Sequence, residues 1–141
     1  MKHNQLSLFD KFIRLKPTLK NLTAKRAQGD KAETLACNFL QSHDLHLLEK
    51  NYSTRAGEVD LIMRDMSDTN TLVFIEVRYR KNTDFGGAAA SVTAKKQQRI
   101  IKAALAYQQQ NAPQSSMRFD VVAIEGDNMD IDWIKSAFSG F

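Results

Sequence analysis

The sequence predicts one α/β domain with the element order α-β-β-β-α-β-β. Three observations favour this fold class. The chain has 141 residues, which is the length of a single ordinary domain. Its apolar fraction is 43% and its charged fraction 26%, a balance typical of globular proteins. Helical and strand periodicities alternate along the chain, without internal repeats or low-complexity segments.

The N-terminal part of the chain is predicted to be a tail followed by a helix. Residues 1–24 contain only one short apolar cluster and are expected to form a flexible basic tail, which leaves 25–141 as the domain. Asp30 followed by Glu33 is typical of a capping box, and apolar residues then recur at helical spacing. This pattern predicts a helix of about 12 residues that ends near Ser42.

Five strands and a second long helix are predicted downstream. Apolar residues alternate with polar ones, or cluster in β-branched runs, in five short segments separated by turn residues. The predicted strands cover residues 45–54, 58–63, 72–80, 118–125 and 129–134. Between the third and fourth strands, Thr93 can cap a helix that has one apolar face and ends near Asn111.

The composition excludes several classes of protein. Cys37 is the only cysteine, which excludes a disulfide framework and a cysteine-based zinc site and suits a reducing cytoplasm. No apolar run approaches the length of a membrane span. Asp10 and Lys11 stand where a signal peptide would be apolar. We therefore expect a soluble cytoplasmic protein.

The charges are unevenly distributed along the chain. Residues 1–31 carry eight Lys and Arg against two Asp, whereas the remaining residues carry 12 basic and 14 acidic groups. A second basic zone lies between residues 78 and 102, and five acids without a base lie between Asp120 and Asp132. Because phosphate contacts dominate affinity for nucleic acids, two basic zones favour an anionic polymer as partner. Solvated surface charge is the alternative.

Two carboxylates are predicted to face each other on neighbouring strands. Glu76 lies on an interior strand with apolar residues on both faces, where a charged side chain is unfavourable unless it has a partner. Asp60 lies among apolar residues of the preceding strand. If the two strands form a hairpin in which Met66 pairs with Asn70, the Cβ atoms of Asp60 and Glu76 lie about 5 Å apart.

This pair of carboxylates predicts a metal site. Two ionised carboxylates that close repel each other, and a divalent cation is the usual means of keeping both charged. Oxygen ligands without His or Cys nearby favour Mg²⁺ or Mn²⁺. Arg78, on the same face as Glu76, could bind a phosphate oxygen. The alternative is a buried ion-pair network in which Arg78 neutralises the carboxylates.

Several strings of the sequence, taken together, resemble a known family. GEVDLI at 57–62 and FIEVRYR at 74–80 resemble the PD-(D/E)xK nuclease superfamily. With NYSTRAGEVDLI, the loop FGGAAASVTAKKQQRI and RFDVVAI at 118–124, the chain more narrowly resembles the YraN-like family of predicted bacterial endonucleases. The resemblance covers about residues 27–135. It implies a restriction-endonuclease-like αβββαβ core, with a central mixed sheet flanked by helices.

The resemblance also implies roles for individual residues. Asp60 and Glu76 correspond to metal ligands, and Glu33 to a further acid that reaches the metal directly or through water; the capping box is the alternative role of Glu33. Arg78 stands where the superfamily usually has lysine. Arginine stays protonated and cannot act as a general base, but it could stabilise charge on the scissile phosphate. Lys96, on the second helix, could replace the missing lysine.

These features lead to a functional expectation. Basic residues outside the site are expected to bind the nucleic-acid backbone, namely Arg80, Lys81, Lys95, Arg99 and Lys102. We expect a Mg²⁺- or Mn²⁺-dependent endonuclease that acts on DNA, branched or single-stranded, in replication, repair or recombination. A non-catalytic nucleic-acid-binding module with the same fold is the alternative, and an RNA nuclease is a third. Cleavage of both strands of a junction would favour a homodimer.

The N-terminal string Gln5, Leu6, Ser7, Leu8 and Phe9 resembles the peptide that binds the bacterial sliding clamp. The pattern of that peptide is Gln-Leu-(Ser/Asp)-Leu-Phe, and all five positions agree. An extended peptide of this kind can insert a leucine and a phenylalanine into apolar pockets. Clamp binding would raise the local concentration of the protein on DNA. The alternatives are docking of this segment on the body or on an anionic membrane surface.

Overall fold

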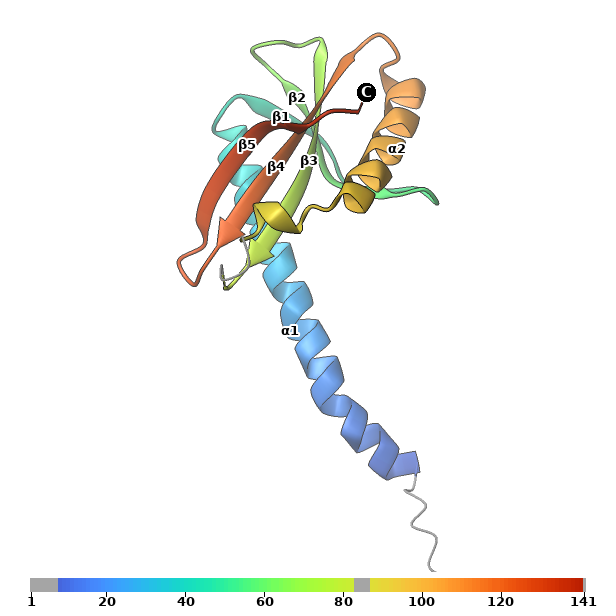
Figure 1. Cartoon of the computed structure of the whole chain (residues 1–141), viewed down its shortest axis with the longest axis vertical. Coiled ribbons are helices and arrows are strands. Elements are labelled where there is room, and N and C mark those ends of the chain that lie inside the picture. The colour runs from blue at the N-terminus through green and yellow to red at the C-terminus, as the bar shows by residue number, and fades with distance from the viewer. Residues whose placement is uncertain (1–7, 83–86, 141) are drawn as a thin grey trace, which may run out of the picture.

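The computed structural model describes residues 8–82 and 87–140, with side chains from residue 22 onward. The elements in chain order are α1 (Leu8–Gln41), β1 (Leu45–Ser53), β2 (Glu58–Asp65), β3 (Thr71–Arg80), the short 3₁₀ helix η1 (Ala89–Ser91), α2 (Ala94–Asn111), β4 (Ser116–Glu125) and β5 (Asp130–Phe138) (Figure 1). The predicted order of helices and strands is confirmed. The short helix η1 is an addition that the sequence pattern did not indicate.

The five strands form one mixed sheet in the order β1-β2-β3-β4-β5. All neighbours are antiparallel except β3 and β4, which pair in parallel along their whole length. Parallel neighbours need a long crossover connection, and η1 and α2 supply it. The predicted fold class, a mixed sheet flanked by helices, is confirmed and is consistent with a restriction-endonuclease-like core.

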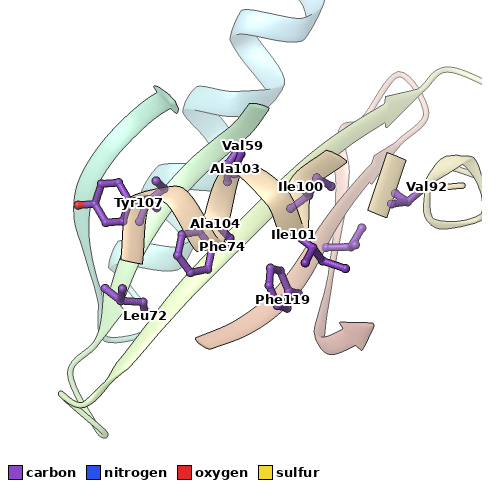
Figure 2. Packing of buried hydrophobic residues seen from close by; sticks show 12 residues of the cluster. Val59, Leu72, Phe74, Val92, Ile100, Ile101, Ala103, Ala104, Tyr107 and Phe119 are labelled. Atoms are coloured by element: carbon purple, nitrogen blue, oxygen red, sulfur yellow. The ribbon is translucent and has the colours of Figure 1, made fainter. Parts of the chain in front are cut away.

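Each face of the sheet is covered by one helix. On one face, Ile100 and Ile101 of α2 pack in a cluster with Phe74 of β3 (Figure 2). On the other face, Leu40 of α1 packs in a second cluster with Ile75 of β3. Successive residues of β3 therefore enter different halves of the core, as alternation along a strand requires. The interior, doubly covered strand that the sequence predicted is β3.

The helix α1 begins at Leu8 instead of after Asp30. Asp30 lies inside the helix, where its backbone carbonyl accepts a hydrogen bond from the Thr34 hydroxyl at 3.0 Å. The predicted capping box of Asp30 and Glu33 was therefore wrong, because an N-cap exists only at the first turn of a helix. The helix continues upstream, mostly through residues of good helix propensity and despite Pro17 and Gly29, so that residues 8–24 are helical and project beyond the sheet (Figure 1).

The helix α2 begins and ends as predicted. The Thr93 hydroxyl accepts a hydrogen bond from the backbone N–H of Lys96 at 3.2 Å, which makes Thr93 the N-cap. The last helical residue is Asn111. This cap fixes the first turn of α2, and Lys96 lies on that turn. Within the described part of the chain, neither α1 nor α2 is long and apolar enough to span a membrane.

A buried ionic network joins β4, β5 and β2 on the α1 face of the sheet. Asp120 is fully buried and accepts hydrogen bonds from Arg118 through both oxygens, each at 2.9 Å. It also accepts from the Trp133 indole and from the backbone N–H of Ser136, each at 3.0 Å. Arg118 donates a further hydrogen bond to Asp65 at 2.8 Å. Since all these groups are paired, we interpret the network as structural.

Candidate active site

The strands β2 and β3 separate where Asp60 and Glu76 lie. Their ladder ends at the pair Leu61–Ile75, and the next position in this register would place Asp60 opposite Glu76. This is the register that the sequence predicted. Beyond the last pair, the backbone N–H of Val77 donates to the Asp60 carboxylate, with 2.8 Å between nitrogen and Oδ2. The side chain of Asp60 thus replaces a backbone carbonyl as the hydrogen-bond acceptor for β3.

Glu76 is a buried carboxylate with one satisfied and one unsatisfied oxygen. Its side chain is 2% exposed. Oε1 lies 3.2 Å from Lys96 Nζ and 3.8 Å from Arg78 Nη1. Oε2 is buried and has no hydrogen-bond partner. A buried carboxylate oxygen without a partner is energetically unfavourable. A proton shared with the neighbouring Asp60, or a bound cation, would relieve it.

Three carboxylates influence one another electrostatically at this point. Burial, followed by the charge of Asp60, raises the pKa of Glu76 to about 8. The same two causes raise the pKa of Glu33, on α1, to about 7. Burial also raises the pKa of Asp60, although the hydrogen bond from Val77 opposes the shift. Crowded, poorly solvated carboxylates of this kind are stabilised in their charged form by a bound cation.

The carboxylates are not arranged around a common point. In residues 22–82 and 87–140, no three His, Cys, Asp or Glu side chains form a ready-made group for a metal ion. The structure brings the predicted ligands Asp60 and Glu76 together on adjacent strands. Glu33 approaches from α1 and interacts with Asp60 through its charge. A three-carboxylate metal site would therefore require side-chain adjustment around the ion.

Two cations approach Glu76 from different elements. Lys96 comes from the first turn of α2 and makes the shorter contact. Arg78 lies two residues after Glu76 on β3, and its Nη2 donates to the backbone carbonyl of Ser91 at 3.0 Å. Its Nε is buried without a partner. Of the alternative role of Arg78, neutralisation of both carboxylates in an ion-pair network, the structure shows the 3.8 Å contact to Glu76, which Glu76 combines with its contact to Lys96.

Gly57, at the start of the GEVDLI string, allows α2 to approach β2. A Cβ atom at this position would overlap the backbone carbonyl of Arg99 on α2. Any other residue would push α2 away, and Lys96 would move with it from Asp60 and Glu76. The glycine in this string therefore has a steric role in assembling the site.

Glu125 holds the segment before α2, and the sequence analysis missed this residue. Its Oε1 accepts a hydrogen bond from the backbone N–H of Ala88 at 2.7 Å. Gly87, with φ of 75°, lies so close that a Cβ would overlap the same carboxylate oxygen. These contacts fix η1 and hence the Ser91 carbonyl that binds Arg78. The sequence offered only one signal, the glycine pair that precedes Ala88.

The basic residues expected to bind a nucleic-acid backbone are exposed in the structure: Arg80, Lys81, Lys95, Arg99 and Lys102. The last three lie on the outer face of α2, as predicted. Lys81 Nζ lies 3.9 Å from an exposed carboxylate oxygen of Asp127. An exposed pair of this kind contributes little to stability, so it does not prevent Lys81 from binding a polyanion.

The predicted clamp-binding peptide lies mostly outside the described residues. Gln5, Leu6 and Ser7 precede the described part of the chain. Leu8 and Phe9 are the first residues of α1, so their backbone is helical, unlike the extended peptide expected from the sequence. Clamp binding stays a prediction.

The fold and the site define a mixed α/β protein in which two carboxylates and a lysine meet where two strands of the sheet separate. The chain belongs to the UPF0102 family: the profile of the uncharacterised protein family UPF0102 matches residues 32–124. It is 49% identical to a UPF0102 protein of Nitrosomonas europaea, over 79% of this chain and 92% of the relative. It is 44% identical to one of Vibrio campbellii, over 84% of this chain and 97% of the relative. The family membership predicted from the YraN-like resemblance is confirmed.

Proposed function

We propose that this protein is a metal-dependent endonuclease that acts on DNA. The observation that carries the proposal is the cluster at the end of the β2–β3 ladder. There Asp60 and Glu76 lie on adjacent strands, and Lys96 contacts Glu76 at 3.2 Å. Carboxylates that bind a metal, together with cations that bind a phosphate, are the groups that phosphodiester hydrolysis requires. The exposed basic residues around the cluster would bind the DNA backbone.

The residues present fit a hard divalent cation. Asp60 and Glu76 offer carboxylate oxygens, and Oε2 of Glu76 is buried without a partner. Mg²⁺ and Mn²⁺ prefer such ligands. Asp60 and Glu76 would hold the ion, and Glu33 would contact it directly or through water. When bound, the ion supplies Lewis-acid activation of water and of the phosphate.

The two cations of the site have different tasks in this proposal. Lys96 would orient the attacking water beside Glu76. Arg78 stays protonated, so it would bind the scissile phosphate and stabilise the charge that develops there. Its guanidinium is held in one direction by the Ser91 carbonyl, while the buried Nε has no protein partner. This division of tasks accounts for an arginine at the position of the usual lysine.

The cellular setting belongs to the same proposal. Branched or single-stranded DNA in the cytoplasm, formed during replication, repair or recombination, would be the substrate. The sliding clamp would be a partner through the N-terminal peptide. A homodimer would allow cleavage of both strands of a junction.

Metal dependence is the first expected result. The purified protein is incubated with labelled duplex, single-stranded, flap and four-way-junction DNA, in Mg²⁺, Mn²⁺ or EDTA. We expect cleavage of at least one substrate with either metal and none in EDTA. Asp60→Asn protein, purified in parallel, identifies cleavage by contaminating nucleases. Binding without cleavage under every condition would contradict the proposal and favour the non-catalytic module.

Lys96 offers a second test with a matched control. Lys96→Met removes the ammonium group beside Glu76, and we expect cleavage to fall by about 10²-fold. Lys95→Met removes the neighbouring exposed charge and is expected to change the rate of cleavage by less than about threefold. The measurement is the single-turnover rate at saturating protein. Equal effects of the two substitutions would show that Lys96 acts only as one more surface charge.

A further inference from the structure

A groove of about 460 Å³ lies between α1 and the end of β3. From α1 it is lined by Lys25, Gln28 and Gly29, and from the other side by residues 77–81. These lining residues come from the part of the chain where α1 leaves the sheet, and Figure 1 shows the helix projecting away from the sheet. The structure therefore has a recess that is separate from the carboxylates themselves.

The groove is connected with the candidate active site on both of its walls. Arg78 belongs to the wall of the groove, and its guanidinium, on the opposite face of β3, lies 3.8 Å from Glu76. On α1, Gly29 and Glu33 are four residues apart and therefore lie on the same side of the helix. Glu33 interacts through its charge with Asp60. An extended polymer that occupies the groove would thus lead to the carboxylates.

The groove has the charge and chemistry of a site for a polyanion. Lys25 supplies a positive charge on one wall, and Arg80 and Lys81 supply two on the other, with no acidic residue among the described lining residues. Tyr79 adds an aromatic ring. Cationic grooves that contain aromatic side chains are typical of sites for single-stranded nucleic acids. The volume is that of a small-ligand site, which suits a few nucleotides of one strand better than a double helix.

We propose that this groove binds a single-stranded segment of nucleic acid and directs it to the Asp60–Glu76 cluster. The phosphates would contact the basic residues of both walls, and a base would lie against Tyr79. The direction of the strand toward the carboxylates rests on the proposed nuclease function, whereas binding in the groove does not. The substrates favoured are single strands, flaps and forks over uninterrupted duplex.

Gly29 makes the groove accessible to a direct test. No atom lies within 4 Å of the position that a Cβ would occupy there. Glutamate and glutamine both have better helix propensity than glycine, so neither substitution should disturb α1. Gly29→Glu places a negative charge at the groove, and Gly29→Gln places a side chain of the same shape without the charge. The comparison of the two isolates the electrostatic contribution.

The experiment measures fluorescence anisotropy with a short labelled single strand and with the matching duplex, in EDTA. Thermal melts verify that each variant is folded. We expect Gly29→Glu to bind the single strand at least about tenfold more weakly than Gly29→Gln does. The affinity of the glutamine variant for the single strand should also fall more steeply with salt concentration. The affinity for duplex should differ by less than about threefold between the variants.

Equal affinity of the two variants for the single strand would overturn the groove proposal. Equal losses on single strand and duplex would overturn it as well, because they would indicate a general surface effect. The outcome is separable from that of the nuclease proposal. If the protein cleaves DNA with metal but the charge at position 29 does not affect single-strand binding, the groove proposal alone is rejected. If single-strand binding depends on the charge at position 29 but the protein cleaves no substrate, the nuclease proposal alone is rejected.

Discussion

Replacing Glu76 by glutamine is expected to abolish metal-dependent cleavage while making the metal-free protein more stable. The substitution removes a proposed metal ligand, and we expect cleavage to fall by at least about 10³-fold. The stability gain follows from burial. The Glu76 carboxylate is 2% exposed, lies close to Asp60, and has one oxygen without a partner. A neutral amide of the same shape relieves both the desolvation and the repulsion.

The stability gain should depend on pH in a defined direction. The pKa of Glu76 is raised from 4.5 to about 8 in the folded protein. Well below pH 4.5 the group is protonated in the folded and unfolded chains, so its ionisation does not affect stability. Between pH 4.5 and 8 the unfolded chain ionises first, which lowers the stability of the folded state. Glu76→Gln should therefore raise the melting temperature by roughly 3–8 °C at pH 8 and by little at pH 4.5.

The measurement is thermal unfolding in EDTA across this pH range, repeated with Mg²⁺. Mg²⁺ should raise the melting temperature of the unsubstituted protein and leave that of Glu76→Gln unchanged, because a ligand stabilises only the state that binds it. Glu49→Gln, on the exposed face of β1, is the control and should alter neither property. A lower melting temperature for Glu76→Gln at pH 8 would contradict the prediction. It would indicate that the ion pair with Lys96 is a net stabilising contact.

Asp120→Asn is expected to destabilise the fold strongly, by about 3–5 kcal/mol. The carboxylate is fully buried and accepts four hydrogen bonds, two of them from Arg118. An amide in its place presents an N–H group to a donor and leaves a partly buried guanidinium without its main counter-charge. The effect contrasts in sign with that of Glu76→Gln, although both substitutions neutralise a buried acid.

Chemical denaturation provides the measurement for this second substitution. The midpoint should fall while the slope stays constant, as expected when stability alone changes. Asp132→Asn neutralises an exposed acid on β5 and should change the free energy of unfolding by less than about 0.5 kcal/mol. If Asp120→Asn were as mild as this control, the network would not contribute to stability in the way that its geometry indicates.

The arrangement of the sheet around the carboxylates could largely be predicted from the sequence. Alternation along a strand has a period of two, and a short turn leaves few choices of register, so the placement of Asp60 opposite Glu76 followed from local information. The cap at Thr93 is also local, since it depends on one hydroxyl and the turn that follows it. Lys96 could be assigned to the border of the apolar face of α2 for the same reason.

Other features depend on contacts between distant residues and gave no reliable local signal. Asp30 and Glu33 have the spacing of a cap, but the helix continues through them because the upstream residues also favour helix. Glu125 and Asp120 occur in one acidic stretch of the sequence, yet the first holds a loop and the second an arginine. Which acid is buried, and beside what, is decided by tertiary packing.

The hydrogen bond from Val77 to Asp60 bears on what the retention of each carboxylate among relatives would mean. Because the Asp60 side chain serves as an acceptor for β3, selection for folding alone would tend to preserve it, even in a lineage that had lost catalysis. Glu76 has the opposite status, since its buried charge disfavours folding and its retention would be explained by the proposed metal-binding role. In comparisons among relatives, an intact glutamate at this position is therefore the more informative indicator of an active protein.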